Sequence, residues 1–120
     1  MNNYLVEEIE QVIKSVPEEE ITPELCSVIF CLGRDAENEE EYDYAFSKLL
    51  ELFERENDTV KARVIQAFSL LAVLKKKIKV LDRSIVEPLI LNTYSHVVGS
   101  DKQTVQDAIE DINHSLNWMI

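Results

Sequence analysis

The sequence predicts an all-α protein, built as three stacked antiparallel helix hairpins in a single domain over residues 1–120. Two observations carry this prediction. The chain has only two glycines and three prolines, too few for the many turns of a β-sandwich or β-barrel. Apolar residues also recur at intervals of three and four along almost the whole chain, which is the spacing of amphipathic helices. With 46% hydrophobic residues, a chain of this length can build one hydrophobic core.

The first hairpin is predicted over about residues 3–33, with helices at 3–16 and 22–33. Pro17 ends the first helix. Thr22 is suited to cap the second helix, because Pro23 follows at its first position, and Gly33 is suited to end it. The residues that recur at helical spacing are Leu5, Ile9, Val12, Ile13, Val16, Leu25, Val28, Ile29 and Leu32.

The second hairpin is predicted over 39–77, with helices at 39–56 and 58–77. Asn38 and Glu41 resemble a capping box at the first of these helices, and Asn57 or Asp58 precedes the other. The basic stretch from Lys75 to Lys79 falls at the end of the hairpin, where cations favour the negative end of a helix dipole.

The third hairpin is predicted over 83–118, with helices at 83–98 and 101–118. Capping boxes are expected at Ser84–Glu87 and Ser100–Gln103, and Pro88 is expected in the first turn of its helix. Over the whole chain we expect the core to contain Ile29, Phe46, Leu49, Phe53, Phe68, Leu71, Leu89, Ile109 and Ile112.

The hairpins repeat with a period of about forty residues, as in arrays of helical repeats. A shift of 41 residues overlays Val64 on Val105, Ala67 on Ala108, Phe68 on Ile109 and Leu71 on Ile112. This pattern over the last two hairpins resembles the HEAT repeat. The resemblance implies a right-handed HEAT- or armadillo-like superhelix, and an irregular helical bundle is the alternative.

The charge is distributed unevenly. The net charge is −11, and residues 1–60 hold 17 acids and 4 bases, whereas residues 61–120 hold 6 acids and 8 bases. Such a field repels nucleic acid and anionic membranes and speeds the encounter with a basic protein. No apolar segment is long enough to span a membrane, and the N-terminus has no signal-peptide pattern, so we expect a cytoplasmic protein.

The sequence contains no recognisable enzyme motif. HExxH, CxxC, GxSxG, GxGxxG and a Walker loop are absent. His96 and His114 lie on different predicted helices, and Cys26 and Cys31 are too far apart around one helix to bridge each other. We therefore expect free thiols, no metal, no cofactor and no catalysis.

Two acidic faces are the candidate binding sites. On the third predicted helix, the outer face carries Glu40, Asp43, Tyr44 and Glu51, and on the sixth it carries Asp107, Glu110 and Asp111. Tyrosine beside charge is enriched in protein interfaces. The simpler alternative is that these residues only form solvated helix faces.

A small, acidic, all-α protein without an active site resembles the immunity proteins of bacterial toxin systems, some of which are HEAT-like and pair with contact-dependent growth-inhibition toxins. The resemblance implies a protein that is monomeric alone. It would neutralise a basic toxin domain, such as a nuclease, in a 1:1 complex through its acidic surface. A HEAT-like adaptor or scaffold without a toxin partner is the alternative.

Overall fold

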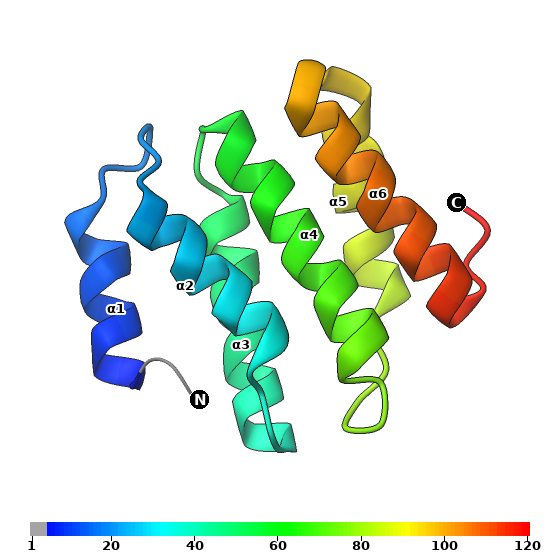
Figure 1. The fold of residues 1–120 in the computed structure, drawn as a ribbon, viewed down its shortest axis with the longest axis horizontal. Coiled ribbons are helices and arrows are strands. Elements are labelled where there is room, and N and C mark those ends of the chain that lie inside the picture. The colour runs from blue at the N-terminus through cyan, green and yellow to red at the C-terminus, as the bar shows by residue number, and fades with distance from the viewer. Residues whose placement is uncertain (1–4) are drawn as a thin grey trace.

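The computed structural model describes residues 5–120, and the chain is all-helical there, with no strand (Figure 1). The helices are α1 (Val6–Ser15), α2 (Pro23–Arg34), α3 (Glu39–Phe53), α4 (Asp58–Leu74), α5 (Arg83–His96) and α6 (Gly99–Leu116). The all-α prediction is confirmed, and each observed helix lies within a few residues of its predicted bounds. The predicted start of the first helix, at residue 3, lies outside the described residues.

The helices form two layers around a central α4. Helices α2, α4 and α6 lie side by side in the near layer of Figure 1, with α3 and α5 behind them and α1 at the edge next to α2. Helix α4 packs against α2, α3, α5 and α6, whereas α1 packs mainly against α2. Consecutive helices run in opposite directions (Figure 1). Whether this arrangement is a HEAT-like superhelix stays a prediction.

The core lies between the two layers, and α4 contributes most to it. Phe68 is completely buried, and seven of the nine predicted core residues are buried. Phe46 and Leu89 are only partly buried and pack against the edge of the core. On α5 the buried face consists of Val86, Ile90 and Thr93, and Leu89 lies about 100° around the helix from Ile90.

Side-chain caps begin the middle helices as predicted. The side-chain oxygens of Thr22, Asn38 and Asn57 accept hydrogen bonds from the backbone N–H three residues later, at 2.9–3.1 Å. Each satisfies one of the donors left free at a helix N-terminus. These caps fix the starts of α2, α3 and α4.

The two predicted capping boxes of the third hairpin are wrong. Helix α5 is capped by Asp82, whose carboxylate accepts from the backbone N–H of Ser84 at 3.1 Å. The helix begins at Arg83, ahead of the predicted cap at Ser84, and Pro88 falls in its second turn, where it removes the hydrogen bond to the carbonyl of Ser84. Helix α6 begins at Gly99, ahead of Ser100, with no side-chain cap.

The sequence predicts that Gly33 ends α2, but Gly33 lies inside the helix, where α2 crosses α4. Helix α2 continues to Arg34, and Asp35 is its C-terminal cap. A Cβ atom at position 33 would lie 2.7 Å from the carbonyl oxygen of Ala67 and 2.9 Å from its Cα. Glycine is thus required because the backbones of α2 and α4 approach each other closely here.

A buried arginine anchors the end of α1. Arg55, just after α3, donates from its guanidinium to the carbonyl oxygens of Ile13 and Val16 at 2.7 and 2.8 Å. These carbonyls lie at the C-terminal end of α1, where no further turn of helix supplies backbone N–H groups to donate to them. The side chain links the end of α1 to the end of α3.

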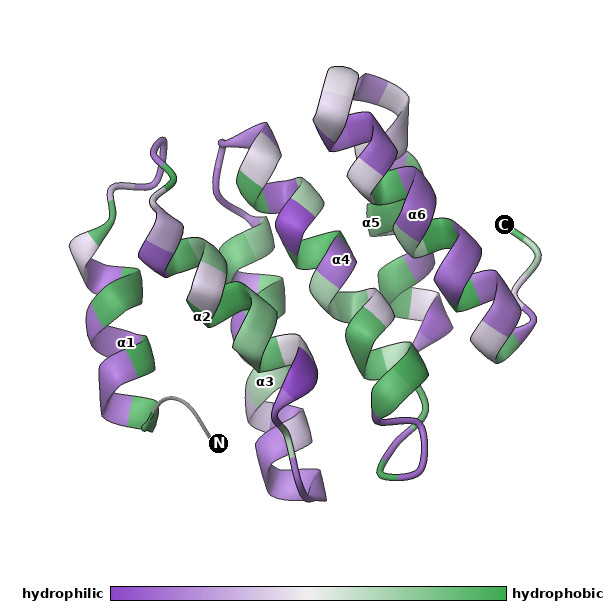
Figure 2. Cartoon of the chain, in the orientation of Figure 1, coloured by the Kyte–Doolittle hydropathy of each residue, from purple (hydrophilic) through white to green (hydrophobic). Residues whose placement is uncertain are grey.

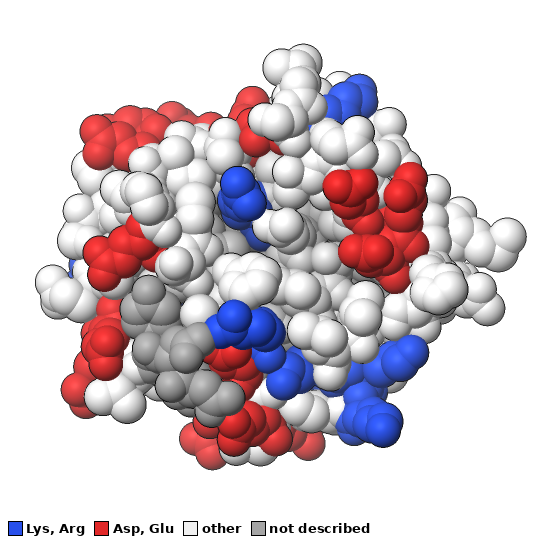
Figure 3. Space-filling view, viewed as in Figure 1, with Lys and Arg blue, Asp and Glu red and all other residues white. Residues whose placement is uncertain are grey.

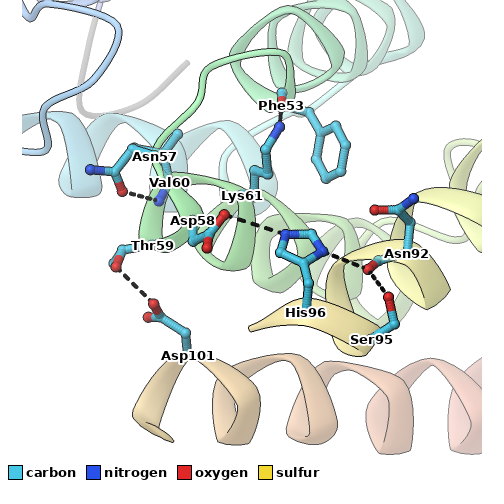
Figure 4. Close-up of polar contacts among 10 residues, drawn as sticks. All are labelled: Phe53, Asn57, Asp58, Thr59, Val60, Lys61, Asn92, Ser95, His96 and Asp101. Carbon is cyan, nitrogen blue, oxygen red and sulfur yellow. Dashed lines mark hydrogen bonds and ion pairs between the residues drawn. The ribbon is translucent and has the colours of Figure 1, made fainter. Parts of the chain in front are cut away.

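Polar contacts join the start of α4 to the third hairpin (Figure 4). Thr59 donates to the carboxylate of Asp101 in the first turn of α6 at 2.8 Å. One ring nitrogen of His96, at the end of α5, lies 3.3 Å from the carboxylate of Asp58. The other ring nitrogen lies 2.8 Å from the carbonyl oxygen of Asn92. These contacts set the ends of the three helices together.

We expect Gly33→Ala to lower the free energy of unfolding by about 1–3 kcal/mol, because the added methyl group meets backbone atoms that have no rotamer to adopt. Helix propensity alone would make the alanine variant more stable by about 1 kcal/mol. A loss of stability therefore indicates that the two backbones approach each other closely at this position. Urea denaturation measures it, with the exposed Ser27→Ala in the same helix as control. A stabilised Gly33→Ala variant would contradict this packing.

We expect Phe68→Ala to lower the free energy of unfolding by about 3–5 kcal/mol, since it empties a fully buried site on the central helix. Phe30→Ala is the matched control, because 40% of Phe30 is exposed, and its loss should stay below about 1 kcal/mol. Denaturant melts of the two variants give the comparison. Equal losses would show that Phe68 is not at the centre of the core.

Candidate interaction surfaces

Only part of the acidic face predicted on α3 is available to a partner, because some of its carboxylates pair with lysines of the same chain. Glu40 is exposed, but the carboxylates of Asp43 and Glu51 are ion-paired within the chain, to Lys79 at 2.7 Å and to Lys48 at 3.0 Å. Tyr44 is half-buried and packs against the core. The structure therefore leaves less charge on this face than the sequence suggests.

Tyr44 points toward α1, so the prediction that it lies on an outer face is wrong. Its hydroxyl donates to the carboxylate of Glu10 at 2.7 Å. Lys48, one turn further along α3, lies 2.7 Å from the same carboxylate. Helix periodicity places Tyr44 opposite the core face of α3, but it contains no information that α1 covers that side.

We call the contact between Glu10, Tyr44 and Lys48 the α1–α3 clamp. Hydrogen bonds from Lys48 and Tyr44 lower the pKa of Glu10. The bond to Glu10 raises the pKa of Lys48, while burial and then the bond to Glu10 raise the pKa of Tyr44. Each group is held in the protonation state that the contact needs, which indicates a structural role for this tyrosine.

One lysine of the basic stretch after α4 also acts within the chain. Helix α4 ends at Leu74, with Lys75 as its C-terminal cap, so Lys79 lies beyond the reach of the helix dipole. Lys79 instead pairs with Asp43 at 2.7 Å and with Glu39 at 3.6 Å, and the hydrogen bond to Asp43 raises its pKa. The dipole explanation is therefore wrong for this lysine, which fastens the α4–α5 loop to α3.

The acidic face of α6 keeps its charge. Asp107, Glu110 and Asp111 are all exposed, and Figure 3 shows acidic side chains gathered over α6. Gln103 donates to Asp107 at 2.8 Å and Gln106 donates to Glu110 at 3.2 Å. Across residues 5–120, no ion pair involves any of the three carboxylates.

A groove of about 540 Å³ lies between α2 and α4 in the same layer. It is lined by Phe30, Arg34 and Arg63 together with the partly exposed Cys26. The guanidinium of Arg34 lies over the ring of Phe30, 4.9 Å from its centre, and is also paired with the carboxylate of Asp35 at 2.6 Å. Its two arginines make this groove a basic part of the surface, which the sequence pattern did not predict.

The described residues include no group of three His, Cys, Asp or Glu side chains that could hold a metal ion. Within the described residues neither Cys26 nor Cys31 forms a disulfide, and His96 and His114 are exposed on different helices. None of the described helices has the length and apolar character needed to cross a membrane.

Comparisons with protein-family models, curated proteins and solved structures gave no match to this chain. The surfaces described above are therefore the basis for inferring its function.

We expect Glu10→Gln to destabilise the fold by up to about 1 kcal/mol at neutral pH, because it breaks the α1–α3 clamp. The folded-state pKa of Glu10 lies below its ordinary value of 4.5, so its stabilisation is complete above that value. It is lost as the pH falls through the lowered pKa. Urea melts over a pH series should show the two proteins converging in acid.

Glu40→Gln on the exposed face of α3 is the control for this series and should follow the wild type at every pH. A difference between Glu10→Gln and the wild type that does not change with pH would contradict the clamp.

Proposed function

We propose that this chain is a non-catalytic binding protein that neutralises a basic protein partner through the acidic face of α6. The observation that carries the proposal is the state of Asp107, Glu110 and Asp111. They are exposed, lie within about one turn of one another, and have no cation paired to them in the part of the chain that the structure describes. Carboxylates in this state are available to lysines and arginines of another molecule.

The face of α6 is favoured over that of α3 for a physical reason. A partner that binds at Asp43 or Glu51 must displace Lys79 or Lys48, and this exchange of one ion pair for another yields little free energy. At α6 the partner gains new charge-assisted contacts without breaking an ion pair. The net charge of −11 adds long-range attraction, which raises the association rate with a basic partner.

In its specific form, the proposal is that the partner is a toxin domain and that this chain is its immunity protein. Small size, an all-helical fold and strong negative charge support this form. A toxin that cleaves nucleic acid is basic because it must hold phosphates. A row of carboxylates can pair with the same lysines and arginines of the toxin and so prevent the nucleic acid from binding.

An adaptor function is the second candidate, and the groove between α2 and α4 is the observation that favours it. Arg34 and Arg63 line that groove, so neighbouring parts of one helix layer carry opposite charges. An adaptor that holds two partners of different charge would need both surfaces, whereas an immunity protein needs only the acidic one.

The candidate toxin is the C-terminal domain of the protein encoded by the gene directly upstream. We expect cells that express this domain to stop growing, and we expect co-expression of this chain to restore their growth. The variant Asp107→Lys/Glu110→Lys/Asp111→Lys should lose the protection, because it repels the basic partner. The variant Glu18→Lys/Glu19→Lys/Glu20→Lys is the matched control, since it makes the same change of net charge at three exposed positions between α1 and α2. Colony counts on inducing medium give the readout.

Protection that survives the reversal on α6 would exclude this face as the binding site. An upstream domain that is harmless to the cells would exclude the immunity function and favour the adaptor.

A further inference from the structure

A second groove lies between α4 and α6, beside the acidic face. It has a volume of about 340 Å³, and Leu70, Val73 and Leu74 form its apolar floor. Val73 is 42% exposed and Leu74 is 52% exposed, although both belong to the central helix of the fold. The last turns of α4 are hydrophobic even on the side that faces the viewer in Figure 2.

The exposed end of α4 contrasts with the rest of that helix. A helix that is apolar on all sides is normally covered on all sides. From Val60 to Ala72 the neighbouring helices bury most of the apolar residues of α4, but Val73 and Leu74 extend beyond this cover. Single exposed apolar residues are common on protein surfaces, whereas adjacent ones that line a groove indicate a surface that another element covers.

The charges around the groove indicate what kind of element this is. Asp111 lines the groove on the α6 side, and Asp107 lies one turn before it on the same helix, about 6 Å away. Lys76, just beyond the end of α4, and His114 also line the groove. Neither carboxylate has a cation partner among residues 5–120. An apolar floor beside a row of free carboxylates is complementary to a segment that carries lysines or arginines next to apolar side chains.

We propose that the groove between α4 and α6 binds a basic amphipathic helix of the partner protein. Its apolar side chains pack on Leu70, Val73 and Leu74, and two bases one turn apart pair with Asp107 and Asp111. The inference rests on the proposed function and adds the chemistry of the partner's contact segment. Helices α4 and α6 run in the same direction side by side (Figure 1), so a third helix can lie along the furrow between them.

Other occupants fit this surface less well. An acidic segment would gain Lys76 as a partner in the groove, but the carboxylates of α6 and the net charge of −11 repel it. The headgroups of an anionic membrane are repelled for the same reason. A basic segment without apolar residues would pair with the carboxylates but would leave Val73 and Leu74 in contact with water.

The test uses the full chain and a synthetic helical peptide of about 15 residues, with leucines on one face and lysines on the other. A scrambled peptide of the same composition keeps the charge and loses the apolar face. Titration calorimetry at physiological ionic strength measures both. We expect the wild-type chain to bind the amphipathic peptide at least about tenfold more tightly than the scrambled one.

The variant Val73→Ser/Leu74→Ser should weaken binding of the amphipathic peptide by roughly tenfold or more, because it removes the apolar floor. Ile85→Ser/Leu91→Ser on α5 is the matched control, since these side chains are 41% and 48% exposed on another helix. Its affinity should stay within about twofold of the wild type. Thermal unfolding of each variant, together with a milder Leu74→Ala, shows whether a loss of affinity reflects a loss of folding.

The groove is excluded if the wild-type chain does not bind the amphipathic peptide, if it binds both peptides equally, or if the two serine variants lose the same affinity. Each of these results leaves the proposed function intact as long as charge reversal on α6 still abolishes protection in cells. Failure of the protection assay together with a groove that discriminates between the peptides would instead remove the toxin partner and keep the binding site.

Discussion

The close approach of α2 to α4 at Gly33 is the contact on which the rest of the architecture depends. With only a hydrogen atom at position 33, the α2 backbone lies against Ala67, and α4 becomes the centre of a layer with α2 on one side and α6 on the other. The two grooves described above both lie along this one helix. The basic groove lies where α4 meets α2, and the apolar groove lies where it meets α6.

Most of the helix bounds could be predicted from the sequence because they depend on local chemistry. Thr22, Asn38 and Asn57 each bond to a backbone N–H three residues later, and such contacts need no knowledge of the fold. Gly33 could not be understood in this way, because its requirement comes from Ala67 on another helix. The predicted cap at Ser84 is wrong because the carboxylate of Asp82, two residues earlier, accepts from the backbone N–H of Ser84 and caps the helix instead.

The same division applies to the candidate site. The acids of α6 are exposed as the sequence predicts, because none of the helices in residues 5–120 covers that face. Tyr44 differs because α1 lies against it and supplies Glu10 as an acceptor, a contact between positions 34 residues apart. The groove beside Val73 and Leu74 was also missed. A periodic pattern identifies the apolar residues of a helix, but not where its neighbours stop covering them.

The two attachments of α1 to α3 differ in chemistry, and this has a mechanical consequence. The arginine at the end of α3 donates to the backbone carbonyls of Ile13 and Val16, so this attachment contains no carboxylate that acid could protonate. The attachment through Glu10, nearer the middle of α1, fails once that carboxylate is protonated. In acid, therefore, α1 should lose its polar contact with Tyr44 and Lys48, while its C-terminal end and its packing against α2 stay in place.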